Sequence, residues 1–157
     1  ASKAIERALD WDGWVWWFPP TFQEMAVKVD EMRDRAAARG KKDWVFATGL
    51  EGWIGDDEDD VRRKHGHRWV RELGFYADNS LAPETKRDAL QNLERAALTL
   101  GNKQKWIDRL GQMRDIVKPD YICLRTRTPN NAPEYYPSKQ ECLETIERLG
   151  EVVAALR

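Results

Sequence analysis

A β-strand–helix–β-strand pattern between residues 14 and 47 constrains the fold more than any other feature of the chain. Two uninterrupted apolar runs, at residues 14–18 and 44–47, are rich in tryptophan, valine and phenylalanine. Short apolar runs without alternation predict strands that are buried on both faces. Two strands joined by one helix predict a right-handed crossover and a parallel pair. The pattern therefore indicates an α/β domain.

The connecting helix is marked at both ends. Thr21 and Glu24 have the spacing of a capping box, and Gly40 stands where a helix C-cap is expected. Between them, apolar residues recur every three or four positions, as on one face of a helix: Phe22, Met25, Val29, Met32 and Ala36.

Downstream of the second strand, the glycine spacing at residues 48–55 predicts a loop. The acidic run at 56–60 predicts the first turn of a helix that ends near Gly74, because carboxylates interact favourably with a helix N-terminus. A two-residue link predicts a helical hairpin, whose first helix begins at Pro83 and ends before Gly101. Its apolar stripe is Leu90, Leu93, Ala97 and Leu100. Asn102 caps the second helix of the hairpin, with the stripe Trp106, Leu110, Met113 and Val117.

Residues 121–127 are the third strand candidate, and they alternate enough to lie at a sheet edge. Ser138 and Glu141 form a second capping box. It opens a last amphipathic helix with the stripe Cys142, Ile146, Leu149, Val153 and Leu156. We expect one α/β domain over residues 1–157, with a small, mainly parallel three-stranded sheet flanked by helices and a helical insertion between strands two and three. The alternative is an α+β fold with an antiparallel edge.

Composition limits the compartment and the class of partner. The chain has 157 residues, a net charge of −1 and two cysteines, Cys123 and Cys142, which we expect to be buried thiols in a reducing compartment. We find neither a signal peptide nor an apolar run of membrane-spanning length, so a cytoplasmic protein without membrane contact is predicted. Residues 1–60 hold 8 basic and 14 acidic side chains, and residues 61–128 hold 15 basic and 8 acidic. The middle of the chain is therefore basic.

Ligands of parallel sheets bind outside the carboxyl ends of the strands, so the loops there are the candidate site. We predict ligand or partner binding by eight residues, including two tryptophans expected in loops, where they can stack on a ligand or anchor an interface. They are Trp11, Thr21, Glu51, Trp53, Asp56, Asp57, Arg127 and Asn130. Trp14, Trp16, Trp17 and Trp44 are expected to build the centre of the β-α-β unit, and Trp69 and Trp106 to fill core.

The sequence predicts no metal site and leaves catalytic residues and any cofactor open. The spacing of Gly49, Gly52 and Gly55 is not a dinucleotide or P-loop fingerprint. His65 and His67, two residues apart, face different sides of a helix, and His65 is expected in the core.

Three functions remain. The leading hypothesis is a binding or regulatory protein that acts through a protein partner, since no catalytic constellation is visible and charge is segregated. The alternative is a small enzyme or ligand-binding protein that uses the strand-end loops on a nucleotide or sugar. A further alternative is nucleic-acid binding through basic helices in residues 61–118, although those basic residues could equally pair within the fold or meet an acidic protein.

Overall fold

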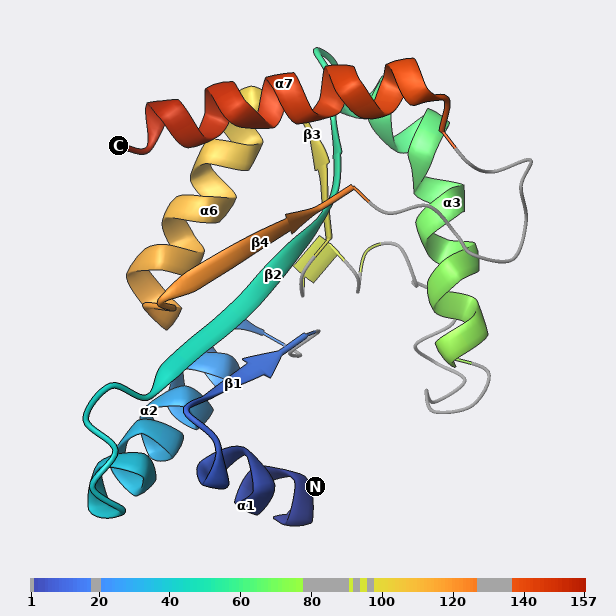
Figure 1. The fold of residues 1–157 in the computed structure, drawn as a ribbon. Helices are drawn as coiled ribbons and strands as arrows, with labels where there is room; N and C mark the ends of the chain where they lie inside the picture. Colours follow the sequence, from blue (N-terminus) through green and yellow to red (C-terminus); the bar gives the residue numbers. More distant parts are fainter. Residues whose placement is uncertain (1, 18–20, 78–90, 92–93, 96–97, 127–136) are drawn as a thin grey trace.

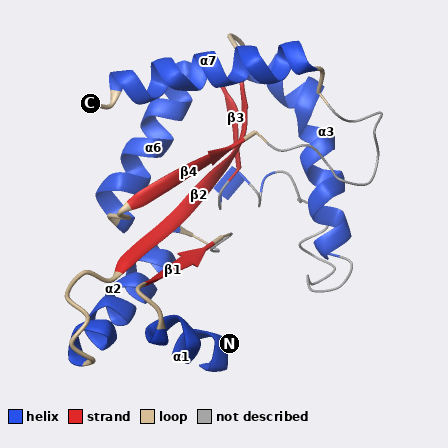
Figure 2. Cartoon of the chain, in the orientation of Figure 1, coloured by secondary structure: helices blue, strands red, loops and turns tan. Residues whose placement is uncertain are grey.

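The computed structural model describes residues 2–17, 21–77, 91, 94–95, 98–126 and 137–157. One sheet lies among helices, with α2 and α6 on one side of it, α3 on the other and α7 across one end (Figures 1 and 2). The helices are α1 (Ser2–Asp10), α2 (Phe22–Ala38), α3 (Glu58–Ala77), α6 (Lys103–Val117) and α7 (Lys139–Ala155). The strands are β1 (Gly13–Trp16), β2 (Val45–Ile54), β3 (Leu98–Gly101) and β4 (Tyr121–Arg125).

The sheet is built around β2, which pairs in parallel with each of the other three strands, so the predicted α/β class with a mainly parallel sheet is confirmed. Thr48 is opposite both Trp16 of β1 and Ile122 of β4. Glu51 is opposite both Leu98 of β3 and Arg125 of β4. Since a strand has two edges, β1 and β3 follow one another along one edge of β2, and β4 occupies the other.

The predicted caps and stripes of α2 and α6 are confirmed. The side chain of Thr21 accepts a hydrogen bond from the Glu24 amide, and that of Asn102 accepts one from the Lys105 amide. Gly40 follows α2 with φ +77°, the left-handed conformation expected beyond a helix end. All the stripe residues of the two helices are buried, and they form one core with Phe46, Leu50 and Ile54 of β2.

The prediction of a loop at residues 48–55 is wrong for residues 48–54, because β2 continues to Ile54. Its glycines permit close packing within a strand. A Cβ atom at Gly49 would lie 2.4 Å from the Trp17 ring, and one at Gly52 would lie 1.8 Å from the Thr99 carbonyl oxygen. Glu51 and Trp53 therefore belong to the central strand and are buried.

The predicted helical hairpin is also wrong. Gln91, Glu94 and Arg95 are helical, but Leu98–Gly101 is strand β3, so the described sheet has four strands. Leu100 lies in that strand, whereas Pro83, Leu90, Leu93 and Ala97 lie outside the described residues. A short apolar run fits a helix end and a buried strand equally well, and only its pairing with β2 decides between them.

Two helices differ in detail from prediction. The α3 helix continues through Gly74 to Ala77. The capping box of α7 is confirmed, but its buried face is Thr145, Leu149 and Val152, and Ile146 is 58% exposed. The predicted stripe is thus rotated by about one position. No helix among the described residues is long and apolar enough to cross a membrane.

The two faces of the sheet are covered unequally. Helices α2 and α6 pack on the face of Phe46 and Leu50. The opposite face, called here the Glu51 face, carries Val15 of β1, Glu51 and Trp53 of β2, and Tyr121, Cys123 and Arg125 of β4, as the register and the two-residue alternation of strands require. Helix α3 contacts the Glu51 face at β3. On the same face, Val15 and Tyr121 are 61% and 66% exposed. Parallel sheets are usually covered on both faces, so part of this face is open.

Candidate functional site

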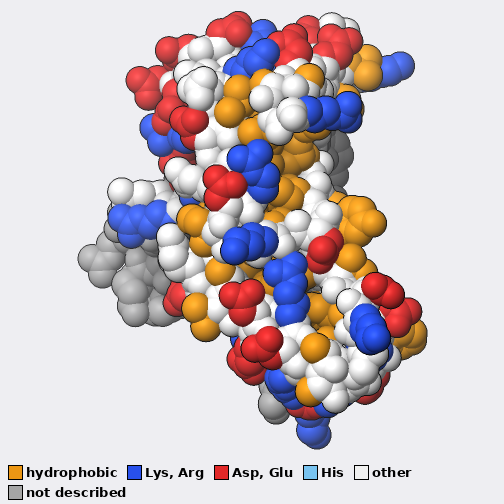
Figure 3. All heavy atoms as spheres, turned by 90° about the vertical axis from the view of Figure 1, so that its left-hand side faces the viewer, with side chains coloured by type: hydrophobic (Ala, Val, Ile, Leu, Met, Phe, Trp, Pro, Cys, Tyr) orange, Lys and Arg blue, Asp and Glu red, His pale blue; other side chains and the backbone are white. Residues whose placement is uncertain are grey.

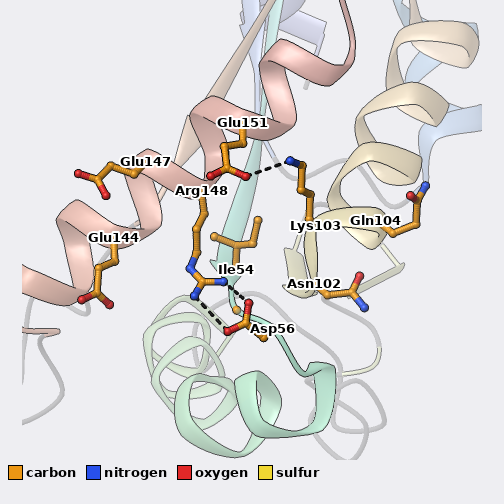
Figure 4. Close-up of a pocket in the computed structure, with 10 residues that line it drawn as sticks. Ile54, Asp56, Asn102, Lys103, Gln104, Glu144, Glu147, Arg148 and Glu151 are labelled. Carbon is orange, nitrogen blue, oxygen red and sulfur yellow. Dashed lines mark hydrogen bonds and ion pairs between the residues drawn. The ribbon is translucent and has the colours of Figure 1, made fainter.

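A cleft of about 590 Å³ lies at the carboxyl ends of β2 and β3, beneath α7 (Figure 4). This is where a parallel sheet is expected to bind ligands. Its lining comes from the end of β2, the start of α6 and one side of α7: Ile54, Gly55, Asp56, Asn102, Lys103, Gln104, Glu144, Glu147, Arg148 and Glu151.

Ion pairs tie α7 to the rest of this cleft. Arg148 donates to both carboxylate oxygens of Asp56, at 2.5 and 3.1 Å, and Lys103 donates to Glu151 at 2.9 Å. The hydrogen bonds from Arg148 lower the pKa of Asp56. Because these side chains are exposed, the pairs position α7 more than they stabilise the fold.

The charge of the cleft argues against phosphate-bearing ligands. Four carboxylates line it, against the two cationic side chains of Lys103 and Arg148. Both cations already contact carboxylates. A phosphate would meet a net negative lining, so a neutral ligand suits the cleft better than a nucleotide.

A second group of polar side chains lies on the Glu51 face. Glu51 is 1% exposed, and its Oε1 accepts a hydrogen bond from the Trp17 indole at 2.5 Å and pairs with the Arg125 guanidinium. The Arg125 guanidinium lies 5.2 Å from the centre of the Trp17 ring, as in a cation–π contact. The Glu51 Oε2 atom is buried and has no hydrogen-bond partner among the described residues.

Beside this group, the Trp53 and His65 rings stack at a centroid distance of 4.4 Å. They line a smaller cleft of about 210 Å³ that shares Asp56 and Arg148 with the larger one. His65 is buried, as predicted. Burial, together with the neighbouring Arg68, lowers its pKa to about 4.

The lowered pKa of His65 predicts a pH-dependent stability. Below pH 6.5 the unfolded chain protonates this histidine while the folded chain does not, so stability should fall from about pH 6.5 to about pH 4, by roughly 3 kcal/mol at most. Urea unfolding at several pH values should show a weaker dependence in His65→Gln than in the wild type. Val27→Ala, at an exposed position of α2, changes no titratable group and should keep the wild-type dependence. Equal slopes in all three proteins would contradict the prediction.

Of the eight predicted site residues, Trp53 and Asp56 line the same cleft. Glu51 and Trp53 lie in β2, and Asp56 and Asp57 follow it. The Asp57 carboxylate accepts a hydrogen bond from the Asp60 amide at the start of α3. Trp11 is 72% exposed before β1, and the Thr21 side chain is engaged with Glu24. Arg127 and Asn130 lie outside the described residues. The grouping of these residues as a ligand site remains a prediction.

Sequence reasoning missed Trp17, Arg125 and Arg148. Trp17 was assigned to the core, and its side chain instead reaches Glu51. Arg125 lies two residues before Arg127, the arginine that the sequence analysis predicts as a site residue. The sequence therefore indicated an arginine in this segment but not which one. Arg148 lies on an exposed helix face that no local pattern distinguishes.

The predicted basic surface is largely paired inside the fold. Arg62 contacts Glu94 at 3.1 Å, and Lys105 contacts Glu58 at 2.8 Å. Arg109 donates to the carbonyls of Glu94 and Arg95. On the side of the molecule shown in Figure 3, acidic and basic side chains lie close together, with hydrophobic ones between. These contacts favour pairing within the fold over phosphate binding.

Comparison with known protein families finds no match, and neither does comparison with curated protein sequences. Solved structures do match. A monooxygenase from Streptomyces bottropensis is 17% identical with a TM-score of 0.71, and a long-chain alkane monooxygenase is 14% identical with a TM-score of 0.67. An EDTA monooxygenase from Chelativorans sp. BNC1 is 13% identical with a TM-score of 0.63. The likeness shows a shared α/β fold.

The likeness covers 98–99% of this chain but only 44%, 39% and 45% of those three proteins, so the chain spans less than half of their length. The leading prediction of a binding or regulatory protein acting through a partner is wrong on this finding, because the neighbours that match nearly the whole chain are monooxygenases.

Proposed function

We propose that this chain forms part of an oxygenase that binds a small, neutral organic substrate at the carboxyl end of its sheet. The observation that carries the proposal is the likeness of nearly the whole chain to three monooxygenases. The cleft beneath α7 supports it, because it lies where parallel sheets bind ligands. The acidic lining of the cleft favours a neutral substrate over a nucleotide.

Monooxygenation places one atom of O₂ in the substrate and releases the other as water, using two electrons and two protons. Proteins carry out O₂ chemistry with haem, flavin, copper or non-haem iron. Among the described residues, no group of three or more His, Cys, Asp or Glu side chains is arranged to hold a metal ion. Because haem, flavin, copper and non-haem iron can each support this reaction, the experiment tests the four cofactor classes in turn.

The test is incorporation of ¹⁸O from ¹⁸O₂, measured by mass spectrometry. The protein is supplied with reduced flavin mononucleotide, reduced haem, Cu(I) or Fe(II), and with a long-chain alkane or an aromatic substrate. We expect one combination to exceed the protein-free control, and Arg148→Ala to lower its yield. Val27→Ala, on an exposed position of α2, should leave it unchanged. No excess ¹⁸O in any combination would contradict the proposal.

We also propose a cytoplasmic location. Its support is that Cys123 and Cys142 are free thiols, as a reducing compartment requires. Their predicted burial is wrong, since Cys123 is exposed and Cys142 half-buried. A protein partner and a single domain over residues 1–157 remain predictions that no observation tests.

A further inference from the structure

The Glu51 carboxylate is an unusual group to find at the centre of a sheet. It is 1% exposed, and both of its described partners, Trp17 and Arg125, contact the same oxygen, Oε1. The other oxygen, Oε2, is buried and has no hydrogen-bond partner in the part of the chain that the structure describes. A buried acceptor that lacks a donor destabilises a fold, so such an atom calls for a partner from outside the described contacts.

The surrounding charge restricts which donor can reach Oε2. Arg125 pairs with the same carboxylate, so a ligand ammonium group would be repelled by the guanidinium. An anionic ligand would be repelled by the carboxylate itself. The donor that fits is therefore neutral, a hydroxyl or an N–H group.

The surroundings of Glu51 along β2 are aromatic. Gly49, two residues before it, is covered by the Trp17 ring, and two residues after it Trp53 stacks on His65. Side chains two residues apart on a strand share a face and lie roughly 6–7 Å apart. Glu51 thus lies between two indole rings on one face of the sheet, and a flat ring is the ligand shape that such walls accept.

The described side chains that contact the Glu51 carboxylate are only partly buried. Trp17 is half-buried, and the Arg125 side chain is 33% exposed although its Nε and Nη2 atoms are buried. Beyond them, Val15 and Tyr121 are exposed. Because Glu51 is 1% exposed, a ligand reaches its carboxylate only if Trp17 and Arg125 move aside.

We propose that the Glu51 face binds a neutral aromatic ligand carrying a hydroxyl group, whose O–H donates to Glu51 Oε2 while its ring lies between Trp17 and Trp53. This inference rests on the proposed function only for the choice of a small organic ligand. The hydroxyl group and the aromatic ring of the ligand are inferred from the Glu51 carboxylate and from the indole rings of Trp17 and Trp53.

Phenol and its methyl ether, anisole, are matched probes, because anisole keeps the ring and lacks the donor. We expect phenol to shift the ¹H–¹⁵N indole signal of Trp17 saturably, since that N–H is bonded to the same carboxylate. The indole signal that disappears in the spectrum of Trp17→Phe is the signal of Trp17. Anisole should bind about tenfold or more weakly, because a hydrogen bond to a charged group is lost.

In Glu51→Gln the preference for phenol should largely disappear, while Glu31→Gln, at an exposed carboxylate of α2, should keep it. Equal binding of phenol and anisole by the wild type, or no saturable shift with either, would overturn the proposal even if Glu51→Gln fails to fold. Persistence of the preference in a folded Glu51→Gln protein would overturn it as well. Because the readout is binding, a phenol preference without ¹⁸O incorporation would refute only the oxygenase proposal.

Discussion

Replacing Trp106 by alanine is expected to lower the free energy of unfolding by about 3–5 kcal/mol, the range for removing a large aromatic side chain from a packed core. Trp106 is fully buried between α6 and the sheet, in the core that α2 and β2 share. Its indole N–H donates to the Trp53 carbonyl at 3.2 Å. The substitution therefore leaves both a cavity and an acceptor without its donor.

Urea unfolding followed by circular dichroism measures this loss. Trp11→Ala is the matched control, because it removes the same side chain from a position that is 72% exposed, and it should change stability by less than about 0.5 kcal/mol. A loss below about 1 kcal/mol for Trp106→Ala would mean that the contact between α6 and β2 is not as described.

Gly52→Ala is expected to destabilise the protein by roughly 3 kcal/mol or more, although it adds a single methyl group. Gly52 has φ +153°, which side-chain-bearing residues rarely adopt, and an added Cβ would lie 1.8 Å from the Thr99 carbonyl oxygen. To relieve that contact, β2 and β3 must separate where they pair.

Gly111→Ala is the control for this prediction. Gly111 lies within α6, and an added Cβ meets no atom within 4 Å. Because glycine disfavours a helix interior, this change should stabilise the protein by about 0.5–1 kcal/mol. Opposite signs for two identical substitutions in the same unfolding assay would confirm the close approach of β2 and β3. Two changes of the same sign would contradict it.

Local patterns predicted the parts of the fold that depend on local physics. The caps at Thr21, Asn102 and Ser138 act within one helical turn, so their side chains and the amides they bind are close in sequence. The parallel pair of β1 and β2 followed from two apolar runs around one amphipathic helix. Such features were predictable because the residues that determine them are neighbours.

The errors arose where strand pairing decided the outcome. The glycines of β2 have the composition of a loop, and only the packing of Trp17 and the approach of Thr99 show why a strand needs them. Residues 98–101 are apolar enough for a helix end, and their pairing with β2 makes them a strand. Composition does not reveal a partner that lies far away in the chain.

The sequence by itself determined the α/β class, the helix boundaries at their caps and the buried stripes of α2 and α6, since these follow from periodicity and local hydrogen bonding. Only the tertiary structure decided that Glu51 is buried, that Trp17 and Arg125 meet at its carboxylate, and that Arg148 spans from α7 to Asp56. These contacts join residues from separate elements. They exist because the parallel register places Arg125 opposite Glu51 and because α7 crosses the carboxyl ends of the strands (Figure 1).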